Sequence, residues 1–366
     1  MAEVGGSYHP TLTKQQEDEL QSVVAKILVS GKGILAADET TEILGSKLSA
    51  LNLENSEVNR RKYRQLLFTT PNFGENISGV ILVEETYNQK ANNGERFVDL
   101  LRKQGIVPGI KVDTGIVPLP GTLGEGTTQG LDDLGKRCAE YKKGGCEFAK
   151  LRCALTVGPH TPSHLALLEN AHVLGRYASV CQQNGLVPIV EPDVMRDGDH
   201  DLERCQKVTE QALAYTYKAL ADYHVFLEGT LLKTNMVTPG QNCSKKYTSE
   251  EIGHATVVAL RRGVPVAVPG IVFLSGGLSE IDATKYLNAS NQVKLLKPWV
   301  LSFSFGRALQ ATVLKEWQGK DENLKKAQKL FLQRAKANGD AQLGKYEGEE
   351  ASAAAIESLF ITKYTY

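Results

Sequence analysis

The sequence predicts an α/β fold, namely a (β/α)₈ (TIM) barrel with additional helices and a mobile C-terminal tail. Eight short apolar runs alternate with amphipathic segments along most of the chain. Because helices cover a parallel sheet on both faces, each of its strands has a nearly continuous apolar sequence. The 366 residues fit two average domains or one large barrel, and the alternation favours the barrel. We expect one barrel domain over residues 1–342 and a flexible tail over 343–366.

The strands are expected where apolar residues cluster between polar or glycine-rich segments. The run at 148–155 alternates, with Lys150 and Arg152 on one face. The run at 226–237 is apolar apart from a few residues such as Lys233, which indicates a strand buried on both faces. A Gly- and Thr-rich segment at 121–130 is expected to be a loop. The expected strands are 32–38, 77–83, 107–113, 148–155, 186–193, 226–237, 270–277 and 298–307.

Several helices carry recognisable start signals. Thr13-Lys-Gln-Gln16 and Thr248-Ser-Glu-Glu251 are capping boxes, and Asp201 is a further N-cap. We expect Thr161 to cap a helix that runs to about residue 184, with Pro162 at its first position. Other helical patterns lie at 52–64, 96–104 and 131–143, and after the last strand as far as about residue 338.

Composition excludes several classes of partner. The chain has 42 basic and 42 acidic side chains, so it offers no net charge for nucleic acid or an anionic membrane. The longest apolar run, at 264–274, is interrupted by Pro265 and Pro269 and is too short to span a bilayer. The first ten residues contain no apolar signal core. Six scattered cysteines without a C-x-x-C pair indicate a reducing compartment, and we expect a cytoplasmic protein.

Charged and small polar residues gather where the expected strands end. In a (β/α)₈ barrel these ends meet at the C-terminal face, where the active site lies. Lys233 follows a buried apolar run, and burial favours the uncharged, nucleophilic form of a lysine, which forms a Schiff base with a carbonyl. A lysine that extends to solvent is the alternative for such a position in isolation. The residues at the strand ends are Asp38, Lys111, Lys150, Arg152, Glu191, Lys233, Ser275 and Arg307.

The last two strand ends favour phosphate binding. Barrels commonly hold phosphate in the loops after strands seven and eight, which here are Ser275-Gly-Gly277 and Ser304-Phe-Gly-Arg307. Glycine lets backbone N–H groups approach phosphate oxygens, and arginine offers a bidentate fork. Glu191 and Asp38 are candidates for proton transfer, whereas Asp193 is expected to be an ion-pair partner of the lysines at the strand ends.

No metal-binding motif is recognisable. Residues 197–201 resemble the start of a calcium loop but lack the glycine and glutamate that complete it. His160 and His164 lie four apart without the rest of a zinc motif. We therefore expect no metal and no other cofactor.

With these residues placed, the chain closely resembles the class I fructose-bisphosphate aldolases, which are metal-free Schiff-base enzymes. The resemblance covers nearly the whole length. The segments that carry it are 31–39, 59–61, 63–67, 126–132, 187–192, 227–233, 273–277 and 306–309.

The resemblance implies reversible cleavage of fructose 1,6-bisphosphate, in glycolysis and gluconeogenesis, to dihydroxyacetone phosphate and glyceraldehyde 3-phosphate. Lys233 would form the imine, Glu191 would move protons during its formation, and Asp38, close to Lys150, would take the C4 hydroxyl proton. Tyr366, on a tail that reaches the active site, would help to protonate the enamine.

The resemblance also implies the binding residues and the partners. Residues expected to hold the C1 phosphate are Ser275, Gly276, Ser304, Gly306 and Arg307, and further substrate-binding candidates are Lys47, Lys111, Arg152 and Gly277. Family members are typically cytosolic homotetramers, and some also bind cytoskeletal filaments.

The departures from the family pattern cluster near the C6 phosphate. Where the family has Ser-Thr-Gly-Ser and then Lys-Arg, this chain has Thr40-Thr-Glu-Ile43 and then Ser46-Lys47. Thr234, Asp193, Phe305 and Leu278 also differ from the usual residues. Since Glu42 repels phosphate and Lys47 lacks the arginine fork, we expect weaker binding of the bisphosphate than is usual in the family. A diverged paralogue that prefers fructose 1-phosphate is an alternative.

Two alternatives remain open. The first is a diverged paralogue kept mainly for a binding role such as cytoskeletal interaction. The second is another Schiff-base barrel of the transaldolase type, against which the phosphate loops and the terminal tyrosine argue.

Overall fold

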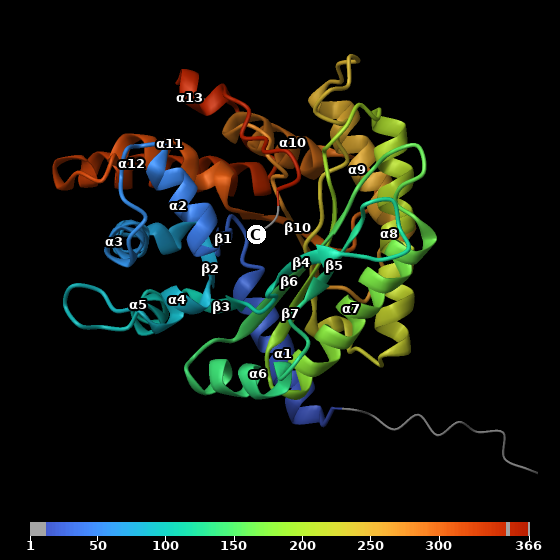
Figure 1. Ribbon diagram of the computed structural model, residues 1–366, viewed down its shortest axis with the longest axis horizontal. Coiled ribbons are helices and arrows are strands. Elements are labelled where there is room, and N and C mark those ends of the chain that lie inside the picture. Colours follow the sequence, from blue (N-terminus) through green and yellow to red (C-terminus); the bar gives the residue numbers. More distant parts are fainter. Residues whose placement is uncertain (1–11, 349–351, 365–366) are drawn as a thin grey trace, which may run out of the picture.

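The computed structural model describes residues 12–348 and 352–364, and it is a (β/α)₈ barrel as predicted (Figure 1). Eight parallel strands close in the order β1-β10-β9-β8-β7-β6-β3-β2. Each expected apolar run supplies one of them. The strands are β1 (Gly33–Ala37), β2 (Ile77–Leu82), β3 (Val107–Lys111), β6 (Phe148–Leu155), β7 (Val187–Val194), β8 (Leu231–Leu232), β9 (Gly270–Phe273) and β10 (Val300–Phe305).

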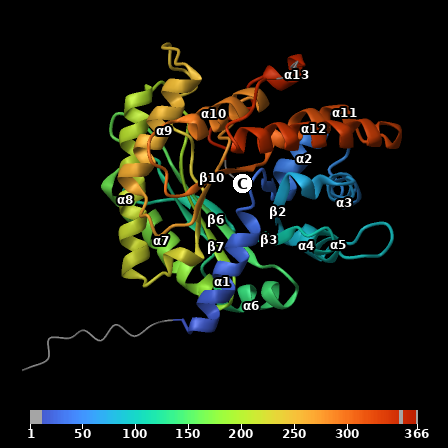
Figure 2. The ribbon, with the colours of Figure 1, turned by 180° about the vertical axis from the view of Figure 1, so that it is seen from behind.

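The helices surround this barrel, as the two opposite views show (Figures 1 and 2). Their apolar sides and the outward side chains of the strands form the largest cluster of buried residues. The helices are α1 (Lys14–Ile27), α2 (Thr41–Ser49), α3 (Glu57–Phe68), α4 (Glu84–Asn88), α5 (Phe97–Lys103), α6 (Leu134–Lys143), α7 (His164–Gln183), α8 (Leu202–Asp222), α9 (Ser249–Gly263), α10 (Glu280–Gln292), α11 (Arg307–Trp317), α12 (Leu324–Gln342) and α13 (Ala353–Ile356). None in the described part of the chain is long and apolar enough to cross a membrane.

The N-terminal end of the barrel is closed by α1. Its buried face, which includes Leu20, Val24 and Ile27, packs against inward side chains of the strands such as Phe148 and Val272. The capping box predicted at Thr13 is present, because Thr13 and Gln16 exchange hydrogen bonds. The capping box at Thr248 and the N-cap at Asp201 are confirmed as well. These apolar side chains form a plug at the N-terminal end of the barrel, and the opposite end is the open one.

The expected strand at 226–237 is shorter than predicted. Residues Leu227–Gly229 form a 3₁₀ turn, and the ladder of β8 covers only Leu231–Leu232. A Cβ atom on Gly229 would lie 3.0 Å from Leu20 of α1, so the chain is packed against the plug there and not in the sheet. The apolar run thus predicted the buried residues correctly but overestimated the length of the strand. A residue can be buried without taking part in the hydrogen-bond ladder of the sheet.

Two further predictions were wrong. The 121–130 segment is not entirely loop, because β4 (Gly115–Pro118) pairs with β5 (Gly126–Gln129) in an antiparallel hairpin. Helix α7 is capped by Ser163 and not by Thr161, since Ser163 Oγ accepts from Ala166 N at 3.1 Å. The Thr161–Pro162 peptide is cis, and the Thr161 carbonyl accepts from Gly158 N at 3.1 Å, which holds this pair in the preceding turn. Helices α2 and α10 were not predicted.

Phe148 fills the barrel interior through the space that Gly109 leaves. A Cβ atom on Gly109 would lie 2.2 Å from the Phe148 ring, which is fully buried. We expect Gly109→Ala to lower the free energy of unfolding by about 1–3 kcal/mol, because the ring must move in a packed core. Urea unfolding at neutral pH measures this.

The matched control for this substitution is Gly135→Ala in α6. A Cβ atom there would meet other atoms only at 3.9 Å, which is ordinary contact. In a helix the change should leave stability equal or raise it by up to about 1 kcal/mol. Equal urea midpoints for the two variants would contradict the packing argument.

Candidate active site

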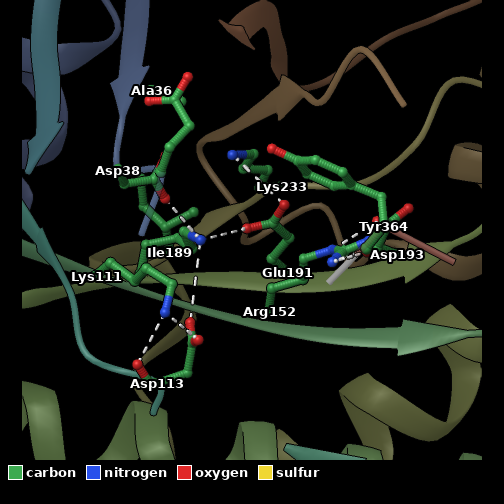
Figure 3. Close-up of polar contacts among 12 residues, drawn as sticks. Ala36, Asp38, Lys111, Asp113, Arg152, Ile189, Glu191, Asp193, Lys233 and Tyr364 are labelled. Atoms are coloured by element: carbon green, nitrogen blue, oxygen red, sulfur yellow. Dashed lines mark hydrogen bonds and ion pairs between the residues drawn. The ribbon is translucent and has the colours of Figure 1, made fainter. Parts of the chain in front are cut away.

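Lys233 and Glu191 lie together at the C-terminal end of the barrel. Lys233 directly follows β8, and its Nζ is 3.4 Å from Oε1 of Glu191 on β7. The other oxygen of Glu191 is 3.6 Å from Nζ of Lys150 on β6. All three side chains are buried, and Figure 3 shows Lys233 and Glu191 pointing toward each other. Glu191 therefore lies between two amines and can exchange a proton with either.

Asp38 completes this group from β1 on the other side of Lys150. Its Oδ2 lies 2.8 Å from Lys150 Nζ. Burial raises the pKa of Asp38, but the charges of Lys150, Lys233 and Lys111 outweigh burial and hold its pKa at about 2. Asp38 is thus a carboxylate at neutral pH and can accept a proton from a nearby hydroxyl.

Lys111 is oriented away from this centre. Its Nζ is 2.5 Å from Asp113 Oδ1 and donates to the Asp113 carbonyl at 2.9 Å. The second oxygen of Asp113 is 4.0 Å from Lys150 Nζ. Asp113, which the sequence analysis did not single out as a site residue, thereby balances two lysines. Lys111 lines a neighbouring cavity and not the one at Lys233.

A cavity of about 60 Å³ opens beside Lys233. Gly276 has a φ of +56° and Gly277 one of +82°, so the turn after β9 requires the left-handed conformation that glycine adopts readily. Gly306 is the N-cap of α11 and Arg307 its first residue, so the amide groups of a helix start face this region. The predicted residues that line the cavity are Asp38, Arg152, Lys233, Ser275, Gly276, Ser304, Gly306 and Arg307.

The described part of the tail covers this cavity. Arg307 donates to the Leu359 carbonyl at 2.7 Å, and its guanidinium carbon lies 4.1 Å from the centre of the Tyr364 ring. Arg152 donates to the Tyr364 carbonyl at 2.9 Å. Tyr364 lines the cavity together with Lys233 and lies beside it in Figure 3. Tyr364 was not predicted as a site residue. Tyr366 was predicted, and it lies outside the described residues.

Arg152 is also committed to Asp193. Its Nε and Nη2 lie 2.8 and 2.7 Å from Asp193 Oδ2. Asp193 is therefore an ion-pair partner as expected, although of an arginine and not of a lysine.

Gly277 and Lys47 are also absent from the lining of the cavity. The Gly277 carbonyl accepts from Leu359 N at 3.1 Å, so this glycine holds the tail. Lys47 on α2 pairs at 2.6 Å with Glu39, which also pairs at 2.9 Å with buried Arg64 of α3. Glu39 and Arg64 lie in segments that carry the family resemblance, but their ion pair was not predicted.

His164 and the Asp-rich loop have structural roles. His164 Nδ1 lies 2.7 Å from the Tyr215 hydroxyl, and Asp201 caps α8. In the described residues, no group of three or more His, Cys, Asp or Glu side chains could hold a metal ion. All six cysteines are free thiols, and all but Cys243 are buried.

The fold and the site define a class of (β/α)₈ proteins with buried lysines and carboxylates at the C-terminal end of the barrel, next to a cavity lined by glycine turns and arginines. A family model described as fructose-bisphosphate aldolase class-I matches residues 19–366. The chain therefore belongs to the class I fructose-bisphosphate aldolase family, and it is a glycolytic enzyme of the aldehyde-lyase type.

Relatives and a solved structure agree with this assignment. The chain is 67% identical to fructose-bisphosphate aldolase 2 of Caenorhabditis elegans, covering 100% of both chains. It is 57% identical to the muscle-type fructose-bisphosphate aldolase of Lethenteron camtschaticum, over 98% of this chain and 99% of that one. Fructose-bisphosphate aldolase from Plasmodium falciparum, solved in complex with TRAP and a small-molecule inhibitor, gives a TM-score of 0.91 at 50% identity. That match covers 92% of this chain and 98% of the solved one.

Glu39 holds the site to the helices through a pH-dependent ion pair. Burial raises the pKa of Glu39, but Lys47 and Arg64 outweigh burial and lower its pKa from 4.5 to about 2. We expect Glu39→Gln to lower the free energy of unfolding at pH 7 by about 3–5 kcal/mol, because Arg64 is left buried without its anion. Because the native pKa is depressed, this stabilisation is present above pH 4.5 and is lost as the pH falls toward 2.

Urea unfolding of both proteins at pH 7 and at pH 3 checks the expectation, and the difference between them should shrink at pH 3. Glu42→Gln, an exposed carboxylate on α2, is the control and should change stability by no more than about 0.5 kcal/mol. A difference that is equal at both pH values would contradict the assigned role of Glu39.

Proposed function

We propose that this aldolase cleaves fructose 1,6-bisphosphate through an imine on Lys233. The observation that carries the proposal is the buried Lys233 amine, 3.4 Å from Glu191, with the Asp38–Lys150 pair across the same space. A lysine amine attacks a ketone only when it is uncharged, and Glu191 can take its proton. The carbinolamine then needs a proton on its oxygen to lose water, which Glu191 can return.

Cleavage follows from the position of Asp38. The carboxylate takes the proton of the C4 hydroxyl, the C3–C4 bond breaks, and its electron pair moves into the imine to give an enamine. Glyceraldehyde 3-phosphate is released. The enamine is protonated at C3, with Tyr366 as the expected donor, and hydrolysis of the imine frees dihydroxyacetone phosphate. Lys150, at 2.8 Å, keeps Asp38 ionised for this step.

The turns after β9 and β10 are suited to the C1 phosphate. Ser275, Gly276, Ser304, Gly306 and Arg307 would form a phosphate cradle, in which the amides of a helix start and one guanidinium face the anion. Arg152 lines the same cavity. Lys47, Lys111 and Gly277 do not line this cavity, and their contact with substrate stays a prediction.

The environment of the enzyme is inferred from the family. We expect a cytoplasmic homotetramer that works without metal or another cofactor, because a protonated imine supplies the electron sink. The solved complex of the Plasmodium falciparum aldolase with TRAP supports protein partners for members of this family. For this chain, a filament-binding role stays a prediction. None of the relatives described above favours a binding-only paralogue over an active enzyme.

Borohydride trapping tests the nucleophile. Reduction in the presence of dihydroxyacetone phosphate should leave a stable adduct on Lys233, which peptide mass analysis locates. Asp38→Asn should still form this adduct and yet lose cleavage by about 10²–10⁴-fold, because Asp38 acts after the imine has formed. An adduct on Lys150, or none from a folded protein, would overturn the mechanism.

Substrate preference tests the C6 end. Lys47 is paired with Glu39 and cannot form the two-pronged contact of arginine. We expect the ratio of kcat/KM for fructose 1,6-bisphosphate to that for fructose 1-phosphate to be smaller than in the muscle-type Lethenteron camtschaticum enzyme. Both enzymes are assayed side by side at one salt concentration. A ratio as large as that of the muscle-type enzyme would contradict this expectation.

A further inference from the structure

A second cavity, of about 220 Å³, lies next to the active site on the same face of the barrel. Its walls come from the loops that follow β7, β8 and β9, from the start of α10 and from the segment after α13. Helices α10 and α13 are in contact and lie together in Figure 1. The space holds several water-sized groups, since one water in the liquid takes about 30 Å³. Arg196 lines both this cavity and the active site.

Among the described residues, Arg196 forms no ion pair. Its Nε and Nη1 are buried and have no hydrogen-bond partner among the described residues. Its carbonyl accepts from Gln241 N at 2.8 Å, which fixes the backbone in place. Burial lowers the pKa of Arg196, yet a guanidinium remains charged in proteins. Because burying N–H groups of a cation without acceptors is costly, this position favours an acceptor group in the cavity.

The other charged residues of the cavity have mainly the same sign. Lys245 and Lys246 are exposed at its edge, and Lys245 Nζ lies 4.7 Å from the centre of the Tyr247 ring. Asp282 is the single carboxylate among the described lining residues. Hydroxyl groups of Ser279, Tyr286 and Ser358 complete the lining. Three cations facing one carboxylate make a region of positive potential.

We propose that this second cavity binds a phosphate-class anion at a site separate from the phosphate cradle. Arg196 is the buried anchor, and Lys245 and Lys246 attract the anion at the edge. A planar guanidinium donates two parallel hydrogen bonds to phosphate, and lysines add charge with freely placed donors. This inference goes beyond the proposed function, which needs only the cavity at Lys233.

The two cavities share structural elements, so an anion in one can act on the other. A Cβ atom on Gly276 would lie 3.5 Å from Arg196 Cδ, so the arginine packs against the cradle turn. Gln241 Nε2 donates to Ser358 Oγ at 3.4 Å. Ser358 lines the second cavity, and Phe360, two residues further, lines the first. An anion held by Arg196 would therefore occupy a cavity that the tail segment also lines.

Isothermal titration calorimetry with inorganic phosphate tests the proposal. The protein is first reduced with borohydride in dihydroxyacetone phosphate, so that its cradle is filled, and it should then bind one phosphate per chain. Arg196→Gln should weaken this binding about tenfold or more, because a bidentate charged contact is lost. Arg261→Gln, which removes an exposed charge on α9 outside the cavity, should leave it unchanged.

A second variant and a second ligand sharpen the result. The double variant Lys245→Gln, Lys246→Gln should weaken phosphate binding several-fold. If Arg196→Gln does not fold, this double variant tests the proposal instead, and unchanged phosphate binding would overturn it. Ribose 5-phosphate that binds more tightly than inorganic phosphate would identify an organic phosphate as the ligand, and equal affinity would identify the phosphoryl group alone.

The proposal is overturned if the trapped enzyme binds no phosphate, or if Arg196→Gln binds it as tightly as the parent. If no adduct forms, it is the proposed function that fails. The titration is then made on Arg307→Ala, in which the phosphate cradle lacks its guanidinium. The proposal is again overturned if this variant binds no phosphate, or if adding Arg196→Gln leaves its phosphate binding unchanged.

Discussion

Charge balance at the mouth of the barrel is the constraint on which the rest of the site depends. Three buried lysines, Lys111, Lys150 and Lys233, would repel one another and could not remain there alone. Asp113, Asp38 and Glu191 lie between them, at 2.5, 2.8 and 3.4 Å from one lysine each. Because each carboxylate faces an amine, a proton can pass between members of the group without changing its total charge.

The register of the strands sets the positions of these charged residues. In the parallel ladder of β6 and β7, the backbone of Arg152 lies opposite Glu191 and that of Lys150 opposite Ile189, so the side chains of neighbouring strands lie at defined levels along the barrel. Lys233 N donates to the Val190 carbonyl at 2.8 Å, which fixes the lysine just beyond the end of β8. Rigid strands hold these groups more precisely than loops would, and α1 closes the other end of the barrel with apolar side chains.

The sequence was sufficient for the barrel and for most strand ends, because burial on both faces leaves a clear apolar signal. It was insufficient where the decisive contact is distant in the chain. The shortening of β8 follows from packing of Gly229 against Leu20, and the N-cap of α7 from a competition between two hydroxyl residues. Arg64 lies in a polar helical pattern that suggests a surface, yet it is buried against Glu39. Single-sequence patterns carry no information on such pairings.

The tail contacts two arginines to which the proposed function assigns substrate binding. Arg307 and Arg152 reach the tail through the neutral carbonyls of Leu359 and Tyr364. A phosphate group offers the same guanidinium groups charged oxygens, and charge-assisted hydrogen bonds are roughly twice as strong as neutral ones. Under the proposed function, the substrate phosphate would therefore compete favourably with the Leu359 carbonyl for Arg307, and this contact between Arg307 and the tail would be exchanged for one with the substrate.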